Sequence, residues 1–80
     1  MTLPTVLPPG SVIGILGGGQ LGRMTALAAA NLGYKTHIYC QDAQEPAAQV
    51  TNRVTLGAFD DLAALKSFAK QCAVVTLEWE

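Results

Sequence analysis

The chain has 80 residues, of which 50% are hydrophobic and 14% charged, and its formal net charge is −1 at pH 7. This composition is too apolar for a disordered chain, and the length allows one small domain at most. The five basic residues are scattered singly, which argues against a nucleic-acid partner. No apolar run approaches the ~20 residues of a membrane helix, so we expect no membrane partner. The N-terminus lacks signal-peptide features and the two cysteines form no CxxC group, which favours a reduced, cytoplasmic compartment.

The predicted elements alternate between strand and helix. Residues 1–10 hold three of the four prolines and predict an extended leader. The apolar run at 11–16 predicts a strand buried on both faces, and the period over 20–32 predicts a helix that Gly33 ends. The remaining predicted elements are a strand at 36–40, a helical turn at 47–49, a strand at 53–56, a helix capped by Asp60 or Asp61, and a strand from 73.

This order of elements predicts an α/β fold, a Rossmann-like three-layer parallel sheet over residues 11–80. The periodicity also predicts which helix faces are buried. The first helix is expected to bury Leu21, Met24, Thr25, Ala28 and Leu32, and the second Leu62, Leu65, Phe68 or Ala69, and Cys72. The last strand runs directly into Glu78-Trp79-Glu80, which leads us to expect that the segment is the front part of a larger protein.

A glycine-rich motif follows the first strand. Gly17-Gly18-Gly19-Gln20-Leu21-Gly22 fits G-x-G-x-x-G between a predicted strand and a predicted helix. In such a motif the first glycine permits the tight turn, the second lets a ligand approach the backbone, and the third lets helix and strand pack closely. Free amides at the helix start would then face an anion, so the motif predicts a phosphate site. A turn that needs glycine for its geometry alone is the alternative.

Two carboxylates at the end of the last strand form a second candidate site. Glu78 and Glu80 are two residues apart, so on a strand both side chains point to the same side. Because the carboxyl ends of parallel strands line the ligand crevice, we expect them beside the glycine loop. A carboxylate opposite an anion site suits a ligand with a phosphate at one end and amine or hydroxyl groups at the other. A solvated strand end is the alternative.

Two rival functions remain open from the residues. A dinucleotide-binding half of an NAD(P)-dependent oxidoreductase should place an acid at the end of the second strand, where Cys40 stands, with Asp42 two residues beyond. A non-catalytic nucleotide-sensing module would need only the phosphate site. His37 has no acidic or cysteine neighbour in the sequence and is expected to be a structural, hydrogen-bonded histidine. No metal-ligand pattern is present, and no catalytic residue is assigned.

The motifs resemble one known family. Three segments are similar to the 5-(carboxyamino)imidazole ribonucleotide synthases of the ATP-grasp superfamily. They are the run from Ile13 through Gly17-Gly18-Gly19-Gln20-Leu21-Gly22-Arg23-Met24, the segment Pro46-Ala47-Ala48-Gln49-Val50 and the final Thr76-Leu77-Glu78-Trp79-Glu80. The likeness covers nearly everything from Val12 to Glu80. It departs at Cys40, where the family often has Asp.

The resemblance implies the N-terminal pre-ATP-grasp domain of a purine-biosynthesis ligase. Such an enzyme carboxylates the amine of 5-aminoimidazole ribonucleotide with bicarbonate, and it binds ATP and Mg²⁺ mainly in later domains. The family is commonly dimeric. The resemblance carries substrate binding onto Gln20, Leu21 and Glu78, beside Gly19 of the loop; Gly17, Gly18, Gly22 and Glu80 are secondary candidates. It also implies that residues 1–80 alone are inactive.

Overall fold

A computed structural model describes residues 7–78 of the chain. Within that range, four parallel strands form one sheet in the order β3-β2-β1-β4. The strands are β1 (Val12–Leu16), β2 (Lys35–Cys40), β3 (Arg53–Leu56) and β4 (Val74–Leu77). The order reverses between β1 and β4, because the chain moves outward from β1 to β3 and then returns across the sheet to β4. The predicted parallel α/β sheet is confirmed.

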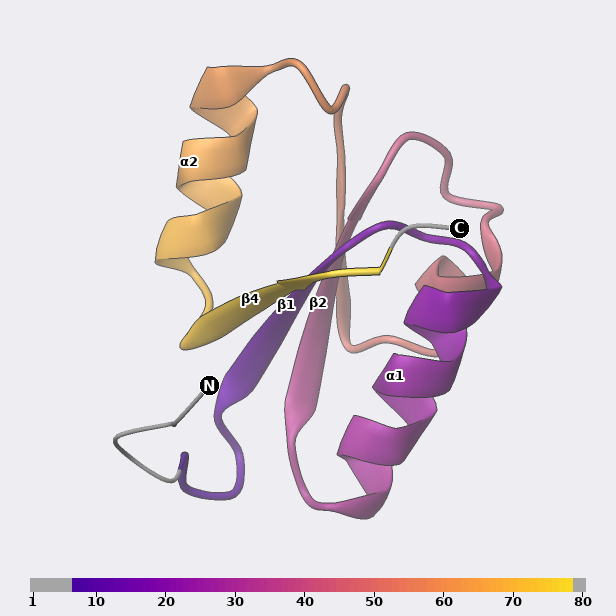
Figure 1. Ribbon diagram of the computed structural model, residues 1–80, viewed down its shortest axis with the longest axis vertical. Coiled ribbons are helices and arrows are strands. Elements are labelled where there is room, and N and C mark those ends of the chain that lie inside the picture. The colour runs from indigo at the N-terminus through magenta and orange to yellow at the C-terminus, as the bar shows by residue number, and fades with distance from the viewer. Residues whose placement is uncertain (1–6, 79–80) are drawn as a thin grey trace.

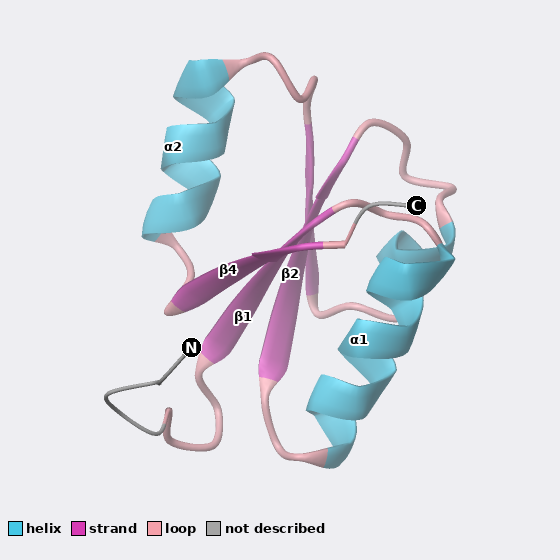
Figure 2. Ribbon diagram, viewed as in Figure 1, coloured by secondary structure: helices cyan, strands magenta, loops and turns pink. Residues whose placement is uncertain are grey.

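Two helices cover opposite faces of the sheet, which makes the predicted three layers (Figures 1 and 2). Helix α1 (Gln20–Asn31) connects β1 to β2, and α2 (Leu62–Lys70) connects β3 to β4. A short 3₁₀ helix, η1 (Pro46–Gln49), lies between β2 and β3. No helix in the described part of the chain is long and apolar enough to span a membrane.

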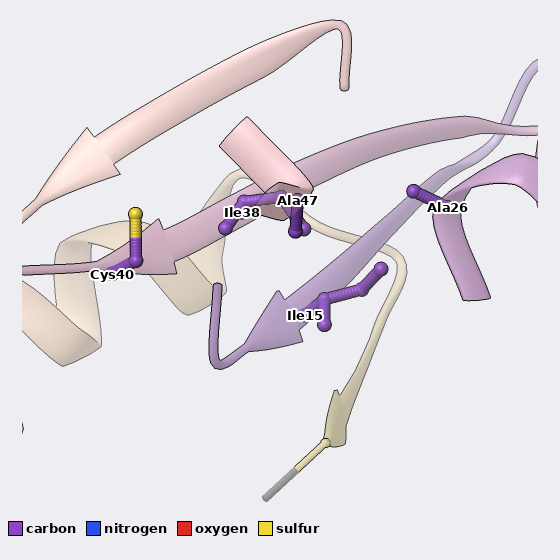
Figure 3. Packing of buried hydrophobic residues seen from close by; sticks show 5 residues of the cluster. All are labelled: Ile15, Ala26, Ile38, Cys40 and Ala47. Atoms are coloured by element: carbon purple, nitrogen blue, oxygen red, sulfur yellow. The ribbon is translucent and has the colours of Figure 1, made fainter. Parts of the chain in front are cut away.

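The core on the α1 side is built from small and branched side chains (Figure 3). Ile15 of β1 and Ile38 of β2 pack with Cys40 against Ala26 of α1 and Ala47 of η1. All five side chains are buried. The two alanines add little bulk, so α1 and η1 can both lie close to the sheet.

The core on the α2 side is aromatic. Because side chains alternate along a strand, His37 and Tyr39 point to the opposite face from Ile38. Both rings pack on Phe68 of α2, with ring centroids 4.7 Å and 5.4 Å away. The Tyr39 hydroxyl donates to the Ala58 carbonyl at 2.7 Å. Gly14 makes room for α2, since a Cβ there would lie 3.0 Å from the Phe68 ring.

The prediction of the buried face of α1 was wrong. Leu21, Met24 and Leu32 are 42%, 59% and 71% exposed. The residues that α1 buries are Gly22, Ala26 and Ala29. These lie on a neighbouring face of the helix, and they are small because α1 packs closely against both η1 and the sheet. Hydrophobic periodicity finds the most apolar face, whereas close packing here selects the smallest one.

The second helix follows the prediction in part. Phe68 is buried, and Leu65 and Cys72 are half-buried, but Leu62 is 70% exposed and Ala69 is exposed. Asp61 caps the helix by accepting a hydrogen bond from the Ala64 amide at 3.0 Å. An N-cap of this kind satisfies an amide that has no partner within the helix.

The connections at the other end of the sheet also match their sequence signals. Gly33 has a φ of +88° just after α1, as expected of a glycine that ends a helix. Of the predicted leader, only residues 7–10 are described. There the Gly10 amide donates to the Gly33 carbonyl at 2.8 Å, and the Tyr34 hydroxyl donates to the Leu7 carbonyl at 2.7 Å.

Candidate functional site

The candidate site lies at the carboxyl ends of β1 and β4, where the strand order reverses. Ligands of open α/β sheets bind at this switch point. Gly17 follows β1 and Glu78 follows β4. The Glu78 amide donates to the Leu16 carbonyl at 3.0 Å, so the residue that carries the carboxylate is held in register with the end of β1.

Gly17 makes the turn that brings the loop and Glu78 together. Its φ is +124°, a conformation that L side chains rarely adopt. A Cβ at this position would also collide with the Glu78 carbonyl oxygen. The Gly17 amide donates to the Tyr39 carbonyl at 3.0 Å, which ties the loop to β2. The sequence-based expectation that Glu78 lies beside the glycine loop is confirmed. Glu80 falls outside the described residues.

The glycine loop places the N-terminus of α1, which is the positive end of the helix dipole, at the switch point. Gly19 is the N-cap and supplies no side-chain hydrogen bond, and the first turn holds no acidic residue. The Arg23 amide donates to the Gly19 carbonyl at 3.0 Å. The amides of Gly19 and Gln20 come earlier in the chain than the Arg23 amide and lie at the start of the helix. The side chains of Gln20 and Leu21 are exposed. The helix N-terminus therefore suits an anion, because its dipole and its amides both favour negative charge.

Thr25 completes the site, although no sequence motif marks it as a functional residue. Its hydroxyl donates to Oε1 of Glu78 at 3.0 Å. The prediction had assigned Thr25 to a buried apolar stripe, whereas the structure places its hydroxyl against a carboxylate from the other side of the switch point. The end of β4 is thus attached to the same helix that offers its N-terminus to an anion.

Helix η1 covers the inner side of the glycine loop. The Ala47 amide donates to the Gly18 carbonyl at 2.8 Å, and Arg23 donates to the Pro46 carbonyl at 3.4 Å. A Cβ on Gly18 would lie 2.8 Å from the Cβ of Cys40. Gly18 is accordingly buried beneath η1 and the end of β2, where the absence of a side chain serves packing.

The acids after β2 are engaged with their own backbone. The Glu45 carboxylate accepts hydrogen bonds from the Gln41 amide at 3.1 Å and the Asp42 amide at 2.9 Å. Asp42 in turn accepts from the Gln44 amide at 2.8 Å. A dinucleotide site needs a strand-end acid that can bond ribose hydroxyls. Here the end of β2 instead closes over the loop through η1, which argues against the dinucleotide interpretation.

The histidine and the two cysteines have structural roles. His37 is fully buried and its Nε2 lies 2.6 Å from the Thr55 hydroxyl. Burial and, to a lesser extent, Arg53 lower the pKa of His37. Burial raises the pKa of both the Cys40 and the Cys72 thiols, which leaves them poor nucleophiles. Within residues 7–78, His, Cys, Asp and Glu side chains form no group of three that could hold a metal ion.

These features define a Rossmann-like α/β domain whose switch point brings together a helix N-terminus without a side-chain cap and a strand-end carboxylate. The chain belongs to the ribonucleotide synthetase preATP-grasp domain family, whose model matches residues 11–80. The resemblance indicated by the glycine-loop and strand-end motifs is thereby confirmed.

Relatives of known name are similar to the chain over most of its length. It is 56% identical over 75 residues to a bifunctional purine synthesis protein of Dictyostelium discoideum, covering 94% of this chain and 8% of that protein. It is 55% identical over 76 residues to the N5-carboxyaminoimidazole ribonucleotide synthase of Brucella melitensis, covering 95% of this chain and 21% of that enzyme. The chain therefore spans about a fifth or less of these two relatives.

Solved structures give the same result. The ADP complex of an N5-carboxyaminoimidazole ribonucleotide synthetase matches with a TM-score of 0.91 and 43% identity, covering 96% of this chain and 20% of that one. An Aspergillus clavatus N5-carboxyaminoimidazole synthase in complex with ADP and 5-aminoimidazole ribonucleotide matches with a TM-score of 0.77 and 37% identity, covering 86% of this chain and 19% of that one.

Proposed function

We propose that this chain is the substrate-side domain of an ATP-dependent carboxyaminoimidazole ribonucleotide synthase of purine biosynthesis. The full-length protein would join bicarbonate to the exocyclic amine of 5-aminoimidazole ribonucleotide. The observation that carries the proposal is the meeting of the Glu78 carboxylate and a helix N-terminus that has no side-chain cap at one switch point. The names of the relatives, and an aminoimidazole ribonucleotide complex among the similar structures, support the choice of substrate.

The two halves of the site suit the two ends of that ribonucleotide. The phosphate carries negative charge, and the backbone at Gly19, Gln20 and Leu21 lies at the positive end of α1. The ribose hydroxyls and the amine are hydrogen-bond donors, and the Glu78 carboxylate is an acceptor. The opposite orientation would place the phosphate against a carboxylate, and the repulsion between like charges disfavours that arrangement. We therefore assign the phosphate to the glycine loop and the hydroxyl or amine groups to Glu78.

Among the residues that the structure describes, His, Cys, Asp and Glu side chains form no group of three that could hold a metal ion. We propose that ATP, Mg²⁺ and bicarbonate are held by parts of the full-length protein outside this segment. The segment contributes binding and orientation of the ribonucleotide. Residues 1–80 alone should accordingly produce no ADP when mixed with ATP, bicarbonate and the ribonucleotide.

The test is steady-state kinetics of the full-length protein that carries this segment. ADP release should depend on both bicarbonate and 5-aminoimidazole ribonucleotide. Glu78→Gln should raise the ribonucleotide KM about tenfold or more, because a hydrogen bond to a charged acceptor becomes a neutral one. Asp60→Asn, an exposed acid near the start of α2, is the matched control and should leave that KM unchanged.

Two results would overturn the proposal. If the wild-type protein binds NADH and Asp42→Asn weakens that binding, the segment is the dinucleotide-binding half of an oxidoreductase. If the protein binds the ribonucleotide but releases neither ADP nor carboxylated product, a nucleotide-sensing role replaces the enzymatic one.

A further inference from the structure

We propose that Thr25 is a positioning residue that fixes the Glu78 carboxylate for the ribonucleotide. The inference rests on the proposed function and extends it to a side chain that does not itself touch the substrate. Its basis is the hydrogen bond from the Thr25 hydroxyl to Oε1 of Glu78, at 3.0 Å, between residues 53 positions apart in the chain.

The bond is an unusual use of a threonine inside a helix. A threonine hydroxyl in a helix interior commonly bonds back to a carbonyl one turn earlier, and threonine is a poorer helix former than alanine or leucine. Thr25 lies in the second turn of α1 and is half-buried. Its hydroxyl instead reaches across to the residue that follows β4. The helix thus accepts a residue of lower propensity at the point where a hydroxyl can reach Glu78.

Glu78 is consequently held at both ends. Its amide donates to the Leu16 carbonyl, which fixes the backbone to β1. Among residues 7–78, Thr25 is the one side chain that hydrogen-bonds its carboxylate, and it engages a single oxygen, Oε1. A glutamate side chain that is free to rotate would lose that freedom when the ligand binds. Thr25 orders the carboxylate in advance and leaves Oε2 for a hydroxyl or amine of the ligand.

Thr25 also sets the spacing between the two halves of the site. The phosphate is assigned to the N-terminus of α1, and Thr25 is on that same helix. The hydroxyl therefore holds the carboxylate at a fixed offset from the phosphate position. A ligand with its phosphate and its donor groups at that separation gains from both contacts, so the bond contributes to the choice among ribonucleotides as well as to affinity.

The experiment compares three variants in the full-length enzyme. Thr25→Val keeps the shape and removes the hydroxyl, and we expect the ribonucleotide KM to rise about five- to tenfold with kcat and the ATP KM within about twofold of wild type. Thr25→Ser keeps the hydroxyl and should stay within about twofold of wild type. Thr51→Val is the control, because Thr51 lies before β3, away from the site, and its hydroxyl hydrogen-bonds the Thr36 hydroxyl. This variant should leave the ribonucleotide KM, the ATP KM and kcat unchanged.

A double variant separates positioning from a general effect on the fold. In a Glu78→Gln background, Thr25→Val should cause little further rise in the ribonucleotide KM, because the group that Thr25 positions is already altered. If Thr25→Val proves unstable in thermal unfolding, Thr25→Ala gives the same comparison with a better helix former.

The proposed role is wrong if Thr25→Val leaves the ribonucleotide KM unchanged. It is equally wrong if the effects of Thr25→Val and Glu78→Gln multiply as independent changes, or if Thr25→Ser is as impaired as Thr25→Val. A wild-type enzyme that shows no ribonucleotide-dependent turnover refutes the proposed function itself, and the role of Thr25 with it. Normal wild-type turnover with an unaffected Thr25→Val variant refutes the role of Thr25 alone.

Discussion

Replacing Gly22 with alanine sets two opposite effects against each other. Gly22 lies within α1, where alanine is favoured over glycine by about 1 kcal/mol. By propensity alone, Gly22→Ala should therefore stabilise the protein. The structure opposes this, because the added Cβ would lie 2.5 Å from the Gly17 carbonyl oxygen and 3.3 Å from the Cβ of Ala47.

The collision with Gly17 is hard to relieve. The Gly17 amide donates to the Tyr39 carbonyl, and the Glu78 carbonyl lies next to the Cα of Gly17. The loop is therefore fixed on two sides. The helix must instead move away from the loop and from η1. Overpacking of this kind costs ~1–3 kcal/mol, and contact with backbone places it at the upper end. Subtracting the gain in propensity leaves a net loss of about 2 kcal/mol, or a Tm lower by roughly 10 °C for a domain of this size.

Urea unfolding of the 80-residue domain, monitored by circular dichroism, measures this difference in the free energy of unfolding. Ala28→Gly is the matched control, because Ala28 is exposed on the same helix and its replacement should cost about 1 kcal/mol through propensity alone. The reasoning is refuted if Gly22→Ala is as stable as wild type or more so while the control behaves as expected. The third glycine of the motif would then not be required for close packing.

Two further predictions concern stability. Asp61→Ala should lower the free energy of unfolding by about 1 kcal/mol, because the Ala64 amide loses its hydrogen-bond acceptor. In the same urea assay, Asp60→Ala should change the free energy of unfolding by a few tenths of a kcal/mol at most. Equal losses in the two variants would contradict the assignment of Asp61 as the cap. Because burial lowers the pKa of His37 below its ordinary 6.5, the unfolded chain takes up a proton there before the folded one does. The contribution of His37 to the free energy of unfolding should therefore be fully present above about pH 7 and decrease as the pH falls below 6.5. Unfolding measured between about pH 5 and 8 should show this decrease in the wild type and not in His37→Gln. The same dependence of the free energy of unfolding on pH in both proteins would contradict the prediction.

The sequence predicted the sheet well because its signals are local and agree with one another. The apolar β1 segment is bounded by Pro9-Gly10 and by the glycine loop, and β2 begins two residues after Gly33, the glycine that follows α1. Each parallel connection has few alternatives once strands and helices alternate. The packing of α1 was not local in this sense. Its buried face is decided by η1, a four-residue element 15 or more positions beyond the end of the helix.

The site was partly predictable for a related reason. The rule that strand ends meet at one edge of a parallel sheet places Glu78 beside the loop without any knowledge of side chains. Thr25 could not be found in this way, because its role depends on the rotation of α1 about its axis. A period that assigned the wrong face to the sheet also assigned Thr25 to the wrong surroundings. The same error hid the fact that Leu21 and Met24 are exposed.

The three glycines of the motif do not carry equal weight as signs of a ligand. Gly17 is explained by a positive φ and by the Glu78 carbonyl, and Gly22 by the Gly17 carbonyl and Ala47. Both are required by contacts within the chain, so a sequence could keep them without binding anything. The case for a ligand rests instead on the helix N-terminus at Gly19, which has no side-chain cap, and on the carboxylate that Thr25 holds nearby. A G-x-G-x-x-G motif therefore indicates a packed turn first, and it indicates a binding site only where the strand ends around it supply a partner group.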